Sequence, residues 1–257
     1  MMSEPALIIL SPSKPAPDLR IYRKGISLRQ YVDNKKAFFV VKRLLDVIIS
    51  AIVIITILSW LLPVLALLIK YTSKGPVLFL QKRTGRGGRS FTCYKLRTMI
   101  NNRYTKPVAS YVEPTVALED MVTPLGRFLR TSNLDELPQF FNVLLGSMSL
   151  VGPRPHMHAD CNAFSLLIPG YKFRNLVKPG ITGLAQVKGY HGKVTSRECI
   201  IKRYEWDAHY VRYAGFWLDV KIMFTTALRG IGIVIRYLAL ATFASPLRSL
   251  RYQERRF

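Results

Sequence analysis

The sequence predicts a mostly α-helical protein with a small β-hairpin or sheet, in which a membrane-embedded re-entrant helix precedes a cytoplasmic α+β module. Three observations support this fold class. An uncharged segment of 23 residues lies near the N-terminus, two short strand-like segments with a glycine-rich turn follow it, and helical periodicity dominates most of the remainder.

The composition indicates an anionic partner at a membrane. Of 257 residues, 38 are Lys or Arg and 15 are Asp or Glu, which gives a net charge of +23. Such an excess is typical of proteins that meet nucleic acid, anionic lipid or phosphorylated substrates. Hydrophobic residues make up 49% of the chain, which favours a membrane surface over soluble nucleic-acid binding. Cys93, Cys161 and Cys199 are widely spaced, so we expect free thiols rather than a disulfide or metal framework.

The uncharged segment, residues 47–69, is long enough to cross a bilayer, because 23 helical residues extend about 34 Å. Basic residues flank it on both sides, and a spanning helix would place one basic cluster outside the cytoplasm. We therefore favour a re-entrant helix over residues 41–72. Pro63 would break it, and Ser59 would help to satisfy a freed carbonyl. An ordinary single span with a kink is the alternative.

The segments around the apolar helix carry simpler signals. Residues 1–40 contain several prolines and little periodicity, so we expect a cytoplasmic N-terminal tail. Residues 76–81 and 91–96 are typical strands, and the basic, glycine-rich residues 85–89 between them predict a hairpin. Residues 100–120 are polar and predict a loop.

The second half of the chain alternates helical and extended signals. Apolar spacing predicts helical regions over 123–146 and 200–222. The short apolar runs 148–151 and 184–187 predict strands or extended loops. Residues 230–243 are apolar but too short to span a membrane, so an in-plane interfacial helix or a core helix is expected.

The most informative short motif is Asp135-Glu136-Leu137-Pro138-Gln139. Proline is tolerated in the first turn of a helix, so the motif predicts a helix that starts just before Pro138, with Asp135 at or near its N-cap. The helix dipole there favours anions, which suits both an ionised carboxylate and a docked phosphate. Taken alone, the motif is more typical of an ordinary helix start with an acidic first turn.

Basic and glycine-rich segments surround this motif and raise its significance. Two prolines flank Arg154, which suits a guanidinium presented rigidly to a phosphate. The loop at 178–187 contains three turn-forming residues, so its backbone can approach a ligand. The candidate phosphate or nucleotide contacts from these segments are Arg127, Arg130, Arg154, Thr182, Gly183 and Gln186.

Taken together, these motifs resemble the bacterial sugar transferase family, the monotopic polyprenyl-phosphate phosphoglycosyl transferases of the undecaprenyl-phosphate hexose-1-phosphate type. The resemblance runs from about residue 40 to 228 in the family's order. The matching segments are 42–46, 75–77, 95–99, 126–130, 134–139, 142–144, 148–155, 177–187 and 207–219. There are departures: the four-helix N-terminal bundle of longer relatives is not expected here, and Ser147 stands where many relatives have Asp.

The resemblance implies a function. The protein would transfer a hexose-1-phosphate from a UDP-sugar to undecaprenyl phosphate and release UMP, as the first membrane step of exopolysaccharide, capsule or O-antigen assembly. Asp135 would be the nucleophile that forms a phosphosugar-aspartyl intermediate. Glu136 would assist, with Mg²⁺ bound by both carboxylates. Arg97, in the matched 95–99 segment, joins the expected phosphate contacts, and glucose or galactose is the expected sugar.

The resemblance also implies an organisation. We expect a cytoplasmic tail (1–40), a re-entrant membrane helix (41–72), a cytoplasmic α+β catalytic domain (73–228) and a C-terminal amphipathic membrane-associated segment (229–257). The expected partners are a UDP-sugar, polyprenol phosphate and lipids of the bacterial inner membrane, but not nucleic acid; homo-oligomerisation stays open. The alternative is a membrane-anchored basic protein without enzymatic activity that binds anionic lipid or nucleic acid. It leaves the order of the motifs unexplained.

Overall fold

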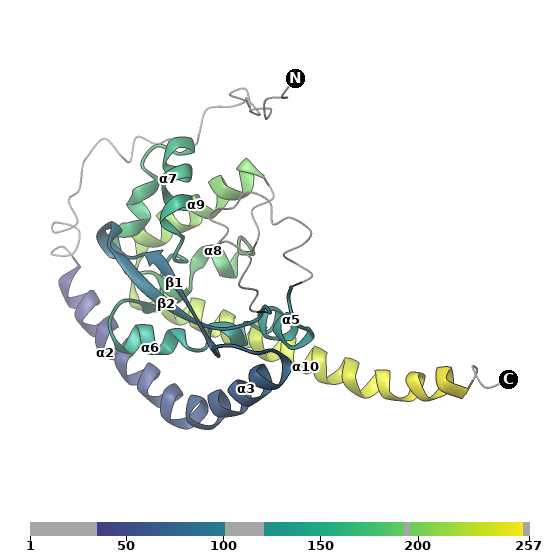
Figure 1. The fold of residues 1–257 in the computed structure, drawn as a ribbon. Coiled ribbons are helices and arrows are strands. Elements are labelled where there is room, and N and C mark those ends of the chain that lie inside the picture. Colours follow the sequence, from purple (N-terminus) through teal and green to yellow (C-terminus); the bar gives the residue numbers. More distant parts are fainter. Residues whose placement is uncertain (1–34, 101–120, 193–195, 254–257) are drawn as a thin grey trace, which may run out of the picture.

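Short helices surround two two-stranded sheets, and two long helical segments flank this body (Figure 1). The computed structural model describes residues 35–100, 121–192 and 196–253. The predicted fold class is confirmed in its coarse form: the protein is mostly helical, with small sheets and one long apolar helix. Most of the predicted tail and the predicted loop at 100–120 lie outside the described residues.

The apolar segment forms a bent helix along one side of the body (Figure 1). It consists of α2 (Lys36–Val53), the π-helical turn η2 (Ile54–Leu58) and α3 (Ser59–Thr72). By length and composition it is the one helix in the described ranges that could cross a membrane. Only 17% of its most apolar 18-residue stretch is buried inside the protein. The wide π turn, a common site of helix distortion, separates the two arms.

Pro63 lies inside α3, and the change in helix type is the π turn that precedes it, so a break caused by Pro63 stays a prediction. Ser59 does satisfy a carbonyl, but a different one: its hydroxyl donates to the Ile55 carbonyl of the π turn at 2.6 Å. The Thr56 hydroxyl likewise donates to the Ile52 carbonyl at 2.7 Å. Side-chain donors thus satisfy backbone groups where the helix changes its hydrogen-bond pattern.

The predicted hairpin is confirmed. β1 (Leu78–Thr84) pairs antiparallel with β2 (Ser90–Leu96), from Leu78 opposite Leu96 to Thr84 opposite Ser90. The turn η3 (Arg86–Gly88) joins them and has positive φ at Gly87 and Gly88. Glycine is the residue that adopts this backbone conformation without steric cost.

The second sheet is very short. β3 (Ser149–Val151) runs parallel to β4 (Gly180–Thr182). A Cβ on Gly180 would lie 2.1 Å from the Gly152 nitrogen, so the two chain segments approach too closely for any side chain. The prediction of an extended segment at 184–187 was wrong, since these residues form the helical turn α8 (Leu184–Val187). Four apolar residues are too few to distinguish the two periodicities.

The helical region predicted at 123–146 is broken into three parts. These are α5 (Pro124–Thr131), the 3-10 turn η4 (Leu134–Glu136) and α6 (Gln139–Leu144). Asn133 adopts a left-handed conformation with φ 58° and ends the first part. Asparagine tolerates this conformation better than most residues.

The C-terminal half is helical. It contains α7 (His158–Leu167), the 3-10 segment η5 (Tyr171–Leu176), α9 (Arg197–Tyr213) and α10 (Phe216–Gln253). The helical prediction for 200–222 is confirmed, except for the break at residues 214–215. Residues 230–243 belong to α10, which continues well beyond the body (Figure 1).

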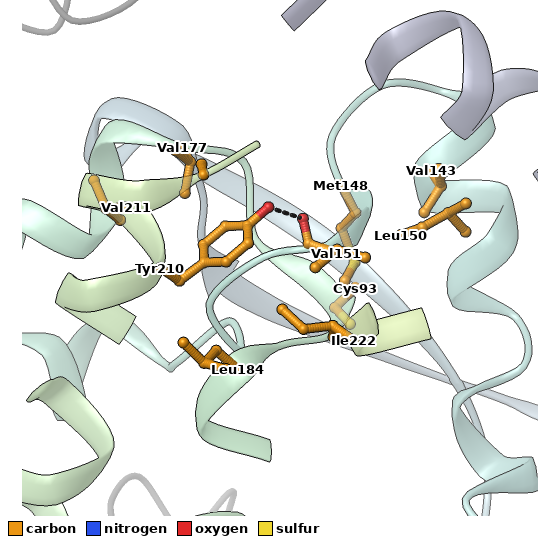
Figure 2. Close-up of a cluster of buried hydrophobic side chains, with 11 residues drawn as sticks. Cys93, Val143, Met148, Leu150, Val151, Val177, Leu184, Tyr210, Val211 and Ile222 are labelled. Atoms are coloured by element: carbon orange, nitrogen blue, oxygen red, sulfur yellow. Dashed lines mark hydrogen bonds between the residues drawn. The ribbon is translucent and has the colours of Figure 1, made fainter. Parts of the chain in front are cut away.

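The main hydrophobic core lies around β3 and β4. Figure 2 shows Tyr210 of α9 beside Val151, with its hydroxyl 3.2 Å from the Val151 carbonyl oxygen. The same hydroxyl donates to Asp219 of α10 at 2.8 Å. The core therefore fixes the end of β3, from which residues 152–155 continue toward the acidic pair. The three cysteines are free, as expected.

Candidate active site

Asp135 and Glu136 lie side by side in the η4 turn and are both buried. The prediction that Asp135 caps a helix was wrong, because α6 begins at Gln139 with Pro138 as its N-cap. The acidic pair therefore lies one turn before the helix. With six residues, α6 contributes only a weak dipole, so neighbouring side chains determine the electrostatics of the pair.

Glu136 is neutralised by two cations. Lys95 of β2 donates to its Oε1 at 2.7 Å. Arg154 approaches in a fork, with Nη2 2.5 Å from Oε1 and Nη1 3.1 Å from Oε2. Burial opposes ionisation of Glu136, but the charges and hydrogen bonds of Arg154 and Lys95 outweigh it and hold the pKa well below its usual range. Glu136 is thus a permanently charged counter-ion.

Asp135 has a contrasting environment. Among the described residues, none donates a hydrogen bond to its carboxylate. Burial and the adjacent Glu136 charge raise the pKa of Asp135 to about 6, against the opposing charges of Lys95, Arg154 and Arg130. The carboxylate is therefore mostly ionised at neutral pH, faces cations and has no hydrogen-bond partner in the part of the chain that the structure describes. This combination suits a nucleophile that attacks an anionic group.

A hydrogen bond to its backbone, in addition to the two flanking prolines, holds Arg154 in position. The Nη2 of Arg174, in η5, donates to the Arg154 carbonyl at 2.6 Å. Arg174 also donates twice to Asp207 Oδ2 of α9, at 3.0 Å and 2.7 Å. Both side chains of this ion pair are 2% exposed. A buried ion pair thus supports the segment that presents Arg154 to Glu136.

The other predicted arginines have different positions. Arg130 donates from Nε to the Thr98 hydroxyl at 2.8 Å, and its charge acts on Asp135. Arg97 donates to the carbonyls of Ser73 and Lys74 at the end of α3, so its visible role is to attach the apolar helix to the hairpin. Arg127 is exposed on α5. Contact between these residues and a nucleotide stays a prediction.

The predicted glycine loop packs beneath the same segment. A Cβ on Gly183 would lie 2.2 Å from the Gly152 carbonyl, and the Thr182 hydroxyl lies 2.6 Å from that of Thr226 on α10. Gln186 donates to the Ile181 carbonyl at 3.1 Å, and its buried Oε1 has no partner within the described ranges. These contacts support the loop internally, and ligand binding by Thr182, Gly183 and Gln186 stays a prediction.

Sequence reasoning missed Lys95 as a site residue. It stands in the matched 95–99 segment, and its position in a half-buried strand was the available signal, because lysine is seldom buried without a partner. Two histidines in the same region have separate partners. His156 is buried with Nδ1 2.6 Å from the Tyr171 hydroxyl, whereas His158 lies 3.2 Å from the Thr84 hydroxyl.

The acidic pair fits Mg²⁺ only when a substrate supplies further ligands. Within the described ranges, no group of three His, Cys, Asp or Glu residues could hold a metal. Both oxygens of Glu136 accept hydrogen bonds from cations, so Asp135 offers the available carboxylate. Mg²⁺ is commonly bound by one or two carboxylates together with substrate phosphates.

Comparison with known proteins gives consistent matches. The sequence model of the family described as bacterial sugar transferase matches residues 37–232. The chain is 46% identical over 191 residues to the UDP-glucose:undecaprenyl-phosphate glucose-1-phosphate transferase of Klebsiella pneumoniae, covering 74% of this chain and 40% of that protein. It is 40% identical over 220 residues to the protein of the same name from Caulobacter vibrioides, covering 86% and 74%.

A relative with a different sugar in its name is similarly close. The UDP-N-acetylgalactosamine-undecaprenyl-phosphate N-acetylgalactosaminephosphotransferase of Aeromonas hydrophila is 42% identical over 187 residues, covering 72% of this chain and 42% of that protein. The chain thus spans about 40% of the length of the first relatives that it matches.

Proposed function

The chain belongs to the bacterial sugar transferase family, and from this premise we propose that it transfers glucose-1-phosphate from UDP-glucose to undecaprenyl phosphate, releasing UMP, in exopolysaccharide synthesis. The observation that carries the proposal is the environment of Asp135, a buried carboxylate that faces cations and accepts no hydrogen bond from the described residues. Glucose is favoured because several relatives carry that activity in their names.

The proposed reaction has two displacement steps at one phosphorus atom. An oxygen of Asp135 attacks the phosphorus nearer the sugar, and the bond from this phosphorus to the bridging oxygen of the diphosphate breaks. UMP leaves with that oxygen, and the sugar phosphate is bound to Asp135 as an acyl phosphate. A phosphate oxygen of undecaprenyl phosphate then attacks the same phosphorus, and Asp135 leaves as a free carboxylate. The product is a lipid-linked diphosphosugar.

The cations beside the pair address the main electrostatic difficulty of this chemistry. A carboxylate that attacks a diphosphate brings like charges together. Lys95 and Arg154 lie close enough to Asp135 to act on its charge, and Glu136 fixes the position of both cations. We therefore assign Glu136 the role of a positioning counter-ion. When bound to Asp135 and the substrate phosphates, Mg²⁺ would add further charge neutralisation.

Both arms of the apolar helix are attached to the same body, which supports the re-entrant placement. On α2, Lys42 forms an ion pair with Asp219 at 2.5 Å, and Asp46 accepts a hydrogen bond from the Leu150 backbone at 3.0 Å. On α3, Leu65 and Ile69 are buried in one cluster with Leu96 and Leu129.

A straight span would carry one end of the apolar helix away from this body. The middle of the helix is largely exposed, with Ile52, Ile55 and Trp60 each more than half exposed. We propose that this middle part enters the inner membrane and that the catalytic body lies on the cytoplasmic face.

The activity is tested with the purified chain, undecaprenyl phosphate, Mg²⁺ and a panel of UDP-glucose, UDP-galactose and UDP-N-acetylgalactosamine. UMP release should be fastest with UDP-glucose and should be lost in Asp135→Asn. Release with none of the three sugars would contradict the proposal. It would favour the alternative of a basic membrane protein without enzymatic activity.

Topology is tested separately by cysteine-accessibility labelling in intact cells. Single cysteines in the N-terminal tail and in the hairpin turn 85–89 should both react only from the cytoplasmic side. Labelling of the two positions from opposite sides would restore a single span.

A further inference from the structure

A second group of basic side chains lies where α2 meets the body. Arg43 comes from α2, Lys178 from the segment before β4, and Arg86 from the hairpin turn. A Cβ placed on Gly146 would lie 3.4 Å from Arg43 Nη2 and 3.7 Å from Lys178 Nζ, so these nitrogens are at most 7.1 Å apart. Gly146 has φ +87°, a conformation that favours glycine, and it leaves the space between them without a side chain.

The positive charge of this group exceeds the negative charge nearby. Burial, followed by the charges of Arg43 and Arg86, lowers the pKa of Lys178, and only Asp46 opposes them. Among the described residues, none pairs with the Lys178 ammonium. Arg43 donates to the Val143 and Leu144 carbonyls, which uses two of its five N–H groups.

An apolar surface adjoins these cations. Val40, Leu44 and Ile48 follow one another at four-residue spacing on α2 and are each more than half exposed. Beside them lies a groove of about 280 Å³, which is lined by three apolar and two basic residues: Phe39, Val40, Leu44, Lys36 and Arg43. A cationic site thus continues directly into a lipid-compatible helix face.

We propose that Arg43 and Lys178 bind the phosphate of an anionic phospholipid whose acyl chain lies along the exposed face of α2. A phosphate that accepts charge-assisted hydrogen bonds of about 2.8 Å on two sides bridges nitrogens about 8 Å apart, which accommodates the separation found here. Basic residues beside a membrane segment commonly recognise such headgroups. The inference depends on the proposed membrane location of α2, but not on sugar transfer.

Ser147, next to Gly146, leaves the excess positive charge uncompensated. Its hydroxyl donates to the Asn142 carbonyl at 3.1 Å, so it brings no negative charge to Arg43 and Lys178. An acidic residue at this position would neutralise the cations internally and compete with a lipid phosphate. This gives a way to remove the site without touching either cation.

The test uses the full chain in a neutral detergent, with phosphatidylglycerol, phosphatidylcholine or inorganic phosphate added at equal concentration. Phosphatidylglycerol should raise the unfolding temperature by roughly 2–4 °C more than phosphatidylcholine. Native mass spectrometry should show that the protein retains phosphatidylglycerol in preference to phosphatidylcholine. Lys178→Gln should lose most of this difference, and Lys178→Arg should keep it.

Equal shifts with both lipids, an equal shift with inorganic phosphate, or an unchanged preference in Lys178→Gln would overturn the proposal. Ser147→Asp is the second variant, with Ser147→Asn as its uncharged match. Ser147→Asp should lose the preference for phosphatidylglycerol and Ser147→Asn should retain it; the reverse would also overturn the proposal. Because binding is the readout, failure here is separate from failure to release UMP.

Discussion

Two buried acids, Asp135 in the η4 turn and Asp207 in α9, differ in their partners. Asp207 is 1% exposed and accepts two hydrogen bonds from Arg174. Asp135 is 9% exposed and accepts none from the described residues. Burial alone therefore does not identify a reactive acid. A partner makes the buried acid structural, whereas the lack of one leaves it available for chemistry.

The two regions are nevertheless connected. Arg174, which pairs with Asp207, also donates to the Arg154 carbonyl, and the Arg154 side chain binds Glu136 next to Asp135. The Arg174–Asp207 ion pair thus supports the Asp135–Glu136 pair through Arg154. Five measurements distinguish the structural role of Asp207 from the chemical role of Asp135.

The largest expected effect is on activity at Asp135. Asp135→Asn should reduce UMP release by about 10⁴-fold, because the amide is a far weaker nucleophile than the carboxylate. Glu205→Gln is the control, since Glu205 is an acid on the surface of α9. Initial rates of UMP release measure both, and substantial activity in Asp135→Asn would remove Asp135 from the mechanism.

The next effect is on stability at Asp207. Asp207→Asn should destabilise the fold by about 3–5 kcal/mol, because it leaves the buried Arg174 charge without its counter-ion. Glu205→Gln, which breaks the exposed Lys202–Glu205 pair, should cost less than about 1 kcal/mol. Chemical denaturation in detergent measures the difference, and equal losses would show that the Arg174–Asp207 pair is not structurally special.

Asp135→Asn should have the opposite effect on stability. The folded state raises the pKa of Asp135 to about 6 from its ordinary value of 3.8, so the fold binds this proton more tightly than the unfolded chain. Ionisation therefore destabilises the fold as pH rises through this interval, by at most about 3 kcal/mol. In metal-free buffer the variant should be more stable than the wild type at pH 7.5, with a smaller advantage near pH 4. An advantage that does not change with pH would refute this assignment.

A smaller effect is expected at the link between the regions. Arg154→Lys keeps the charge but loses the two-point contact with Glu136, so kcat/KM for UDP-glucose should fall about 10–100-fold. Stability should change little. Steady-state kinetics and thermal unfolding together measure this, and a purely structural role would instead lower the unfolding temperature.

The smallest effect at physiological pH concerns the protonation of Asp135. With a pKa of about 6, the nucleophile is mostly ionised at neutral pH, so kcat/KM should be nearly constant there. Below pH 6 it should fall about tenfold per pH unit. A rate profile that stays flat to pH 5 would place the pKa elsewhere.

Several features of this protein follow from local sequence signals. The uncharged run at 47–69 predicts a long apolar helix, because 23 adjacent residues without charge are long enough to cross a bilayer. Two strand-like segments on either side of a glycine-rich turn determine the β1–β2 hairpin. The ordered motifs also predicted the family.

The tertiary structure decided which charges meet. Lys95 and Glu136 are 41 residues apart, and Arg174 and Asp207 are 33 apart, so no local pattern indicates either pair. The same holds for the hydrogen bonds from Arg97 to backbone carbonyls at the end of α3, while phosphate contact by Arg97 stays a prediction. The sequence alone thus identified Asp135 and Glu136, because they stand next to each other in one short motif. Their individual roles depend on burial and on partners brought together by folding.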